Sequence, residues 1–188
     1  RVRGLRVNFV SPQSWGETTP EMLTTLARKV ARQPGWHIQV FMHPEQIVAW
    51  ASVLAALPVP LVVDHLGRIA PAEGPAAEAF GVLRRLLDGG NTWVKLSGGY
   101  MRSTVHGPSY ADTLPLGRAL VQAAPERLVW GSDWPHASAS AGHQPMPDDA
   151  QQIESLAAWT GDDALLRRVL VDNAAALYGF SPHTKGDT

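Results

Sequence analysis

The order of apolar and polar positions along the chain predicts short strands separated by helices. Five apolar runs predict strands at residues 4–9, 36–41, 60–65, 92–97 and 127–133. Apolar residues at helical spacing predict helices that start at residues 20 and 44, one that runs through residues 80–87, and three more at 116–124, 150–160 and 163–177. Strands that alternate with helices in this way form βαβ units and a parallel sheet, so the predicted fold class is α/β.

Polar side chains stand at the end of each predicted strand: Asn8; Gln39 and His43; Asp64 and His65; Lys95 and Ser97; and Asp133. A (β/α)8 TIM barrel carries its active site at the C-terminal ends of its strands, so the pattern favours that architecture. A complete barrel takes roughly 250 residues, whereas this chain has 188. We therefore expect about five βα units of a barrel in a single domain at residues 1–180, followed by a flexible tail at residues 181–188.

Composition narrows the classes of function. The chain is 45% hydrophobic and 18% charged, which excludes disorder over most of its length. The net charge of −1, without a basic stripe, argues against a nucleic-acid partner. Cysteine is absent, which excludes disulfides and thiolate nucleophiles. No apolar run reaches the roughly 18 residues of a membrane span and no signal peptide is recognisable, so we expect a cytoplasmic protein without a membrane partner.

Two side chains after the third predicted strand are candidates for a site. His65 is compatible with a buried imidazole satisfied by a backbone carbonyl, or with a metal ligand or electrophile at a barrel mouth. Arg68 follows three residues later, where a guanidinium can hold a carboxylate through two parallel hydrogen bonds. A solvated loop charge is the alternative for Arg68.

Asp133 ends the fifth predicted strand and lies between Trp130 and Trp134. A carboxylate that is partly removed from water is a stronger base near neutral pH, so Asp133 is a candidate general base. A role in a turn or a helix cap is the alternative. His136 either binds substrate or caps the loop.

Three further cationic side chains lie in or just after predicted strands. Lys95 is predicted to pair with an acid, with a ligand contact as the alternative. Arg6 lies inside the first strand, where an unpaired charge is costly, so we expect a partner for it. Arg102 follows Gly98 and Gly99 in a flexible loop that can place its charge over the barrel mouth.

Four segments of the chain resemble the amidohydrolase-related TIM-barrel hydrolases, and within them the 2-pyrone-4,6-dicarboxylate lactonase group. The segments are VDHLGR at 63–68, WVKLSG at 93–98, WGSDWPH at 130–136 and VDNAAALYGF at 171–180. The resemblance extends over residues 3–180. The strings DHLGR and GSDWPH are specific to the family when they occur in this order. They are less specific for substrate, because sugar-lactone lactonases and decarboxylases share much of this frame.

The resemblance implies that His65 is the histidine of the sixth barrel strand and Asp133 the aspartate of the eighth, so that the five strands would be strands 4–8. It also implies that Arg68 and Arg102 bind substrate carboxylates, that His136 lies near the substrate, and that Arg6 is a further substrate-binding residue on the fourth strand. The His-x-His pair of the family's first strand has no match here. The chain therefore resembles the C-terminal five-eighths of the barrel.

The leading hypothesis is a hydrolase that opens a lactone of a carboxylate-bearing small molecule. Asp133 would activate water, and His65 would stabilise the oxyanion. The expected cofactor is none or one divalent metal, zinc or manganese, with His65 and Asp133 as its ligands if an ion binds. The alternatives are a divalent-metal-dependent sugar lactonase or decarboxylase of the same superfamily, and an inactive truncated barrel. The expected partner is a small anionic substrate, and a homo-oligomer is left open.

Overall fold

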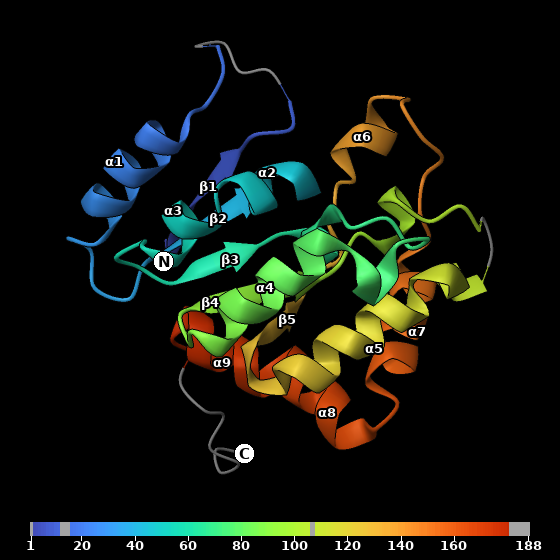
Figure 1. Ribbon diagram of the computed structural model, residues 1–188. Coiled ribbons are helices and arrows are strands. Elements are labelled where there is room, and N and C mark those ends of the chain that lie inside the picture. The colour runs from blue at the N-terminus through green and yellow to red at the C-terminus, as the bar shows by residue number, and fades with distance from the viewer. Residues whose placement is uncertain (1, 12–15, 106–107, 181–188) are drawn as a thin grey trace.

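The computed structural model describes residues 2–11, 16–105 and 108–180, and the predicted tail at 181–188 lies outside them (Figure 1). Within these ranges the strands are β1 (Gly4–Asn8), β2 (His37–Phe41), β3 (Leu61–Val63), β4 (Thr92–Leu96) and β5 (Leu128–Trp130). They form one sheet in the order β1-β2-β3-β4-β5, and each strand is parallel to its neighbour. The predicted parallel α/β sheet is therefore confirmed.

Helices connect the strands and follow the last one. The helices of the described residues are α1 (Pro20–Val30), α2 (Pro44–Ala49), α3 (Ala51–Ala55), α4 (Glu78–Asp88), α5 (Leu114–Ala123), α6 (Ala137–Ser140), α7 (Asp149–Thr160), α8 (Asp163–Arg167) and α9 (Asn173–Tyr178). The start of α1 follows the predicted signals, because the Thr19 hydroxyl accepts a hydrogen bond from the Met22 amide and Pro20 occupies the first turn.

The structure differs from the predicted elements in several places. The strand predicted at 60–65 ends at Val63, because a left-handed turn begins at His65. The helix from residue 44 is divided at Trp50, whose backbone (φ −109°, ψ 18°) is not helical. A π-helical turn, Arg168–Asp172, interrupts the last predicted helix. The strand predicted to reach Asp133 ends at Trp130, because Asp133 has a left-handed backbone (φ 67°). The short helix α6 lies in a segment predicted to be a loop.

The two faces of the sheet are packed differently, because side chains alternate along each strand. One face meets the helices in the main core, which includes the fully buried residues Ile38, Val40 and Val94 of the strands and Leu23, Leu83 and Leu120 of the helices. On the other face, a small cluster of Val62, Trp93 and Val129 packs against Leu177 and Tyr178 of α9.

The loops that follow β3, β4 and β5 meet at one end of the sheet, where α6 also lies, whereas α8 and α9 lie toward the other end (Figure 1). The parallel strands explain this arrangement, because their C-terminal ends share one edge of the molecule. Among the described helices, none is long and apolar enough to cross a lipid bilayer.

Candidate active site

The ends of β3 and β5 bring His65 and Asp133 together. His65 Nε2 lies 3.4 Å from Asp133 Oδ1. The imidazole is 5% exposed and the carboxylate side chain is 23% exposed. Solvent therefore reaches Asp133, while His65 is buried behind it. The two residues that the sequence analysis placed at a common rim are therefore neighbours, although 68 positions separate them in the chain (133 − 65).

The second nitrogen of the His65 imidazole contacts Ser97, the residue that directly follows β4. His65 Nδ1 lies 2.9 Å from the Ser97 hydroxyl, which can donate or accept. A carboxylate only accepts, so the contact with Asp133 is favourable with the proton on Nε2, and Ser97 then donates to Nδ1. Burial lowers the pKa of His65 below its usual value, against the opposing effect of Asp64 and Asp133. The site thus favours a neutral imidazole whose Nε2–H points toward Asp133.

Tyr100 is a site residue that the sequence analysis missed. Its hydroxyl donates a hydrogen bond of 2.8 Å to Asp133 Oδ2. Burial, and then the bond to Asp133, raise the pKa of Tyr100, so the phenol keeps its proton and remains a donor. The signal available in the sequence was its place in the loop after β4, three residues beyond Ser97. The two carboxylate oxygens therefore have different neighbours: Tyr100 at Oδ2 and His65 at Oδ1.

Arg68 and Arg102 are the two cations that the sequence analysis predicts to bind carboxylates, and that role stays a prediction. The Arg68 guanidinium lies 4.7 Å from the centre of the Phe41 ring, and its Nε is buried without a hydrogen-bond partner. Burial, and then the charge of Arg102, lower the pKa of Arg68 from its usual value. The charge of Arg102 therefore acts on Arg68, and a bound anion would offset that effect.

Arg6 and Lys95 both pair with Asp64. Arg6 Nε lies 2.8 Å from Asp64 Oδ2, and Lys95 Nζ lies 3.6 Å from Asp64 Oδ1. The structure thus supplies the partner expected for Arg6 and the acid expected for Lys95. The Arg6 guanidinium also lies 4.9 Å from the centre of the Phe41 ring, on which Arg68 packs.

His136 is buried beside Tyr100, and one of its ring nitrogens contacts the carboxylate of Asp149. His136 Nε2 lies 3.3 Å from Asp149 Oδ1, and its ring packs edge-on against Tyr100 with centroids 5.8 Å apart. Its Nδ1 is buried without a hydrogen-bond partner. His136 thus contacts a neighbour of Asp133, and its predicted contact with substrate stays a prediction.

Backbone strain gathers at the predicted site residues. Of the non-glycine residues with positive φ in the described ranges, His65, Leu66 and Arg68 follow β3, and Asp133 and His136 follow β5. Each left-handed residue of this kind costs about 1–2 kcal/mol. Such strain persists where surrounding structure enforces it, and it occurs frequently at functional sites. This observation supports the location of the site independently of side-chain chemistry.

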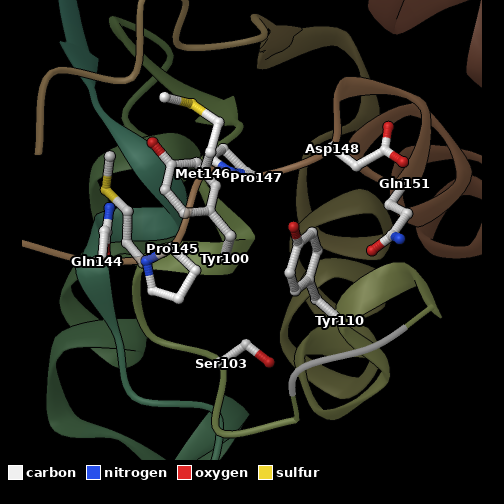
Figure 2. Close-up of a pocket in the computed structure, with 10 residues that line it drawn as sticks. Tyr100, Ser103, Tyr110, Gln144, Pro145, Met146, Pro147, Asp148 and Gln151 are labelled. Carbon is white, nitrogen blue, oxygen red and sulfur yellow. The ribbon is translucent and has the colours of Figure 1, made fainter. Parts of the chain in front are cut away.

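A cavity of about 350 Å³ adjoins the site through Tyr100 (Figure 2). Figure 2 shows Tyr100 and Tyr110 on opposite sides of it. The other lining residues are Met101, Ser103, Gln144, Pro145, Met146, Pro147, Asp148 and Gln151. The cavity therefore offers room for part of a small molecule beside the residue that bonds Asp133.

The described residues do not complete a catalytic metal site. No three of their His, Asp and Glu side chains gather in a way that would hold an ion. His65 and Asp133 together offer two donors, whereas catalytic zinc is bound by three protein ligands.

Comparisons with known proteins agree with this fold and identify a family. The family model described as Amidohydrolase matches residues 1–180. A 4-sulfomuconolactone hydrolase from Rhizobium radiobacter is 34% identical over 178 residues, which are 95% of this chain and 58% of that protein. A 2-pyrone-4,6-dicarboxylate hydrolase from Comamonas testosteroni is 32% identical over 186 residues, which cover 94% of this chain and 59% of that protein.

A solved structure shows the same architecture. The crystal structure of a candidate 2-pyrone-4,6-dicarboxylic acid hydrolase from Pseudomonas putida matches with a TM-score of 0.77 and 28% identity, over 97% of this chain and 65% of that one. The chain spans less than two thirds of the length of each of these three proteins. The family match covers nearly the whole sequence and includes every strand of the sheet, so the chain belongs to the amidohydrolase family.

Proposed function

We propose that the chain carries the catalytic carboxylate of a hydrolase that opens a lactone bearing anionic groups. The observation that carries the proposal is the contact of 3.4 Å between His65 Nε2 and Asp133 Oδ1. The contact supports the proposal, because a carboxylate and a neutral N–H donor lie side by side at a partly exposed position. Lactone hydrolysis needs both groups, one to activate water and one to stabilise an oxyanion.

Asp133 Oδ1 accepts a proton from a water molecule, and the water oxygen bonds to the ring carbonyl carbon. Once Oδ1 has taken the proton it no longer attracts the His65 Nε2–H as a carboxylate oxygen does, and that N–H turns to the carbonyl oxygen, which becomes an oxyanion. Collapse of the tetrahedral intermediate breaks the ring C–O bond, and Asp133 returns its proton to the departing ring oxygen. The products are a carboxylic acid, which ionises in water, and a hydroxyl group on the opened chain. Tyr100 keeps Oδ2 occupied throughout.

The substrate carries carboxylates or similar anions, which Arg68 and Arg102 bind. The unpartnered Nε of Arg68 and the effect of the Arg102 charge on Arg68 support an anionic ligand. The names of the relatives, a 2-pyrone-4,6-dicarboxylate hydrolase and a 4-sulfomuconolactone hydrolase, both describe lactones with anionic substituents. We also propose that the five strands correspond to the last five of a (β/α)8 barrel, because the strings DHLGR at 64–68 and GSDWPH at 131–136 resemble the ends of the family's sixth and eighth strands.

The experiment is steady-state hydrolysis of 2-pyrone-4,6-dicarboxylate by paired variants. We expect Asp133→Asn to lower kcat by about 100-fold or more, because it removes the base. We expect Arg68→Ala to raise KM about tenfold, since a charge-assisted contact is lost. Asp172→Asn, which removes an exposed acid paired with Arg167, is the control and leaves both constants unchanged. A wild-type kcat in folded Asp133→Asn would refute the assignment of the base.

A further inference from the structure

We infer that Asp64 is a positioning residue: Arg6, Gln39 and Lys95 hold its carboxylate, and it anchors the left-handed turn that aims His65 and Arg68 into the site. The inference rests on the proposed function, because it explains how two residues of that site are presented. It also gives Arg6 and Lys95 a role distinct from contact with substrate.

The contacts of Asp64 reach across most of the sheet. Arg6 comes from β1, and its Nε lies 2.8 Å from Oδ2. Gln39 comes from β2, and its Nε2 donates to Oδ1 at 2.8 Å and to Oδ2 at 3.0 Å. Lys95 comes from β4, with its Nζ at 3.6 Å from Oδ1. Asp64 directly follows β3, so one carboxylate joins four of the five strands of the described sheet.

A role in stability alone does not account for this carboxylate. The Asp64 side chain is 1% exposed, and burial of a charge carries a desolvation penalty that its partners offset only in good geometry. Apolar residues of similar size are frequently as stabilising as a buried ion pair. Val62, two positions earlier and on the same face as Asp64, is fully buried and shows that this face of the sheet accommodates such residues. Beyond packing, the carboxylate provides a fixed orientation of the Asp64 side chain, because each of its oxygens has defined donors.

Asp64 is the last extended residue before the turn. Its backbone (φ −73°, ψ 149°) is that of a strand, and its amide donates to the Val40 carbonyl at 3.0 Å. The next four residues, 65–68, all have φ between 51° and 65°. The Gly67 amide donates back to the Asp64 carbonyl at 3.0 Å and closes the turn. Asp64 therefore forms both the entry and the backbone anchor of this left-handed segment.

The turn decides where the two functional side chains point. His65 reaches Ser97 and Asp133, and its ring is so near Gly98 that a β-carbon there would lie 2.7 Å from Nδ1. Arg68 rests on the Phe41 ring, and its Nε has no hydrogen-bond partner to correct its position. A rotation of the turn would move both groups together, so the anchor at Asp64 controls imidazole and guanidinium jointly.

The test compares Asp64→Asn with Asp172→Asn, which makes the same chemical change at an exposed ion pair. Two readouts are used at one pH: the imidazole ¹⁵N chemical shifts of His65, and the affinity for isophthalate, an aromatic dicarboxylate without an ester. Asp64→Asn is expected to move the His65 signals and to weaken isophthalate binding about tenfold, since small misplacements of binding groups are costly. Asp172→Asn is expected to change neither.

Unchanged His65 signals in folded Asp64→Asn would overturn the inference. If Asp64→Asn fails to fold, Gln39→Met decides the matter, because it removes two hydrogen bonds to Asp64 and leaves both cations in place. It is expected to shift the same His65 signals, and their constancy would overturn the inference equally. If the wild-type protein neither binds isophthalate nor hydrolyses the lactone, the proposed function fails, while the ¹⁵N comparison still tests the role of Asp64.

Discussion

The carboxylate of Asp133 has two oxygens in two different environments. Oδ2 accepts from Tyr100, and Oδ1 faces His65. The bond at Oδ2 is 2.8 Å long, whereas the contact at Oδ1 is 3.4 Å, longer than an ordinary N–H···O hydrogen bond, so an incoming water would meet Oδ1 beside the imidazole. Tyr100 would therefore select the oxygen that takes the proton through its hydrogen bond to Asp133.

Replacement of Tyr100 tests whether its hydrogen bond to Oδ2 of Asp133 matters for catalysis. We expect Tyr100→Phe to lower kcat about tenfold, because a hydrogen bond to a charged group contributes about 1.5–3 kcal/mol. KM should change less than twofold, since Arg68 and Arg102, the cations proposed to bind substrate, are untouched. Steady-state kinetics with the lactone substrate gives both constants.

The matched control is Tyr110→Phe, which removes a phenol hydroxyl on the other side of the same cavity (Figure 2). Tyr110 is buried and has no contact with Asp133 among the described interactions. We expect kcat to stay within twofold of the wild-type value. Equal losses in the two variants would show that the cavity, rather than the bond to Asp133, is responsible.

The turn after β3 and the loop after β4 pack closely, and this packing depends on the backbone of Gly98. Gly98 has φ 62° and lies against the ring of His65, so it needs both a left-handed backbone and the absence of a side chain. The left-handed turn at His65–Arg68 and the loop after β4 can therefore approach only because one of them carries no β-carbon.

A pair of glycine substitutions separates these two requirements. Gly161 also has φ 62°, but a β-carbon there would meet nothing within 4 Å. We expect Gly161→Ala to lower the free energy of unfolding by about 1–2 kcal/mol, the cost of the left-handed backbone alone. Gly98→Ala should cost a further 1–3 kcal/mol, roughly, from the clash with His65. Denaturant titration of both variants measures the difference, and equal losses would contradict the close approach.

At the scale of the whole molecule, a buried histidine, His37, should make the free energy of unfolding depend on pH. His37 at the start of β2 is buried, its Nδ1 has no hydrogen-bond partner, and its ring packs edge-on against Tyr178. Burial, and then the charge of Lys95, lower the pKa of His37 below 6.5. The unfolded chain therefore binds a proton at higher pH than the folded chain does.

Stability should consequently fall as the pH drops below about 6.5, where unfolded histidine takes up its proton. We expect the wild-type protein to lose more stability between pH 7.5 and 5.5 than His37→Leu does. His143→Leu, at an exposed histidine, is the control and should keep the wild-type slope. Thermal unfolding at the two pH values measures the slopes, and identical slopes for wild type and His37→Leu would rule out His37 as a source of acid sensitivity.

Local pattern was sufficient for the parallel α/β sheet and for the rim on which His65, Arg68 and Asp133 lie. The reason is that strand and helix periodicity, capping signals such as Thr19-Pro20, and polar residues at strand ends are all properties of short segments. Once the strands are parallel, their C-terminal ends share an edge, so the convergence of His65 and Asp133 followed from the fold class.

Tertiary contacts decided the rest. The three partners of Asp64, the bond from Tyr100 to Asp133 and the pairing of His136 with Asp149 join residues far apart in the chain, up to 58 positions for Arg6 and Asp64. The left-handed backbone at His65–Arg68 and at Asp133 runs against the intrinsic preference of these residue types, and only the surrounding packing enforces it. Side-chain partners across strands and strained backbone are set by the assembled sheet. The local pattern could therefore predict that Arg6 and Lys95 have partners, but not that both pair with Asp64.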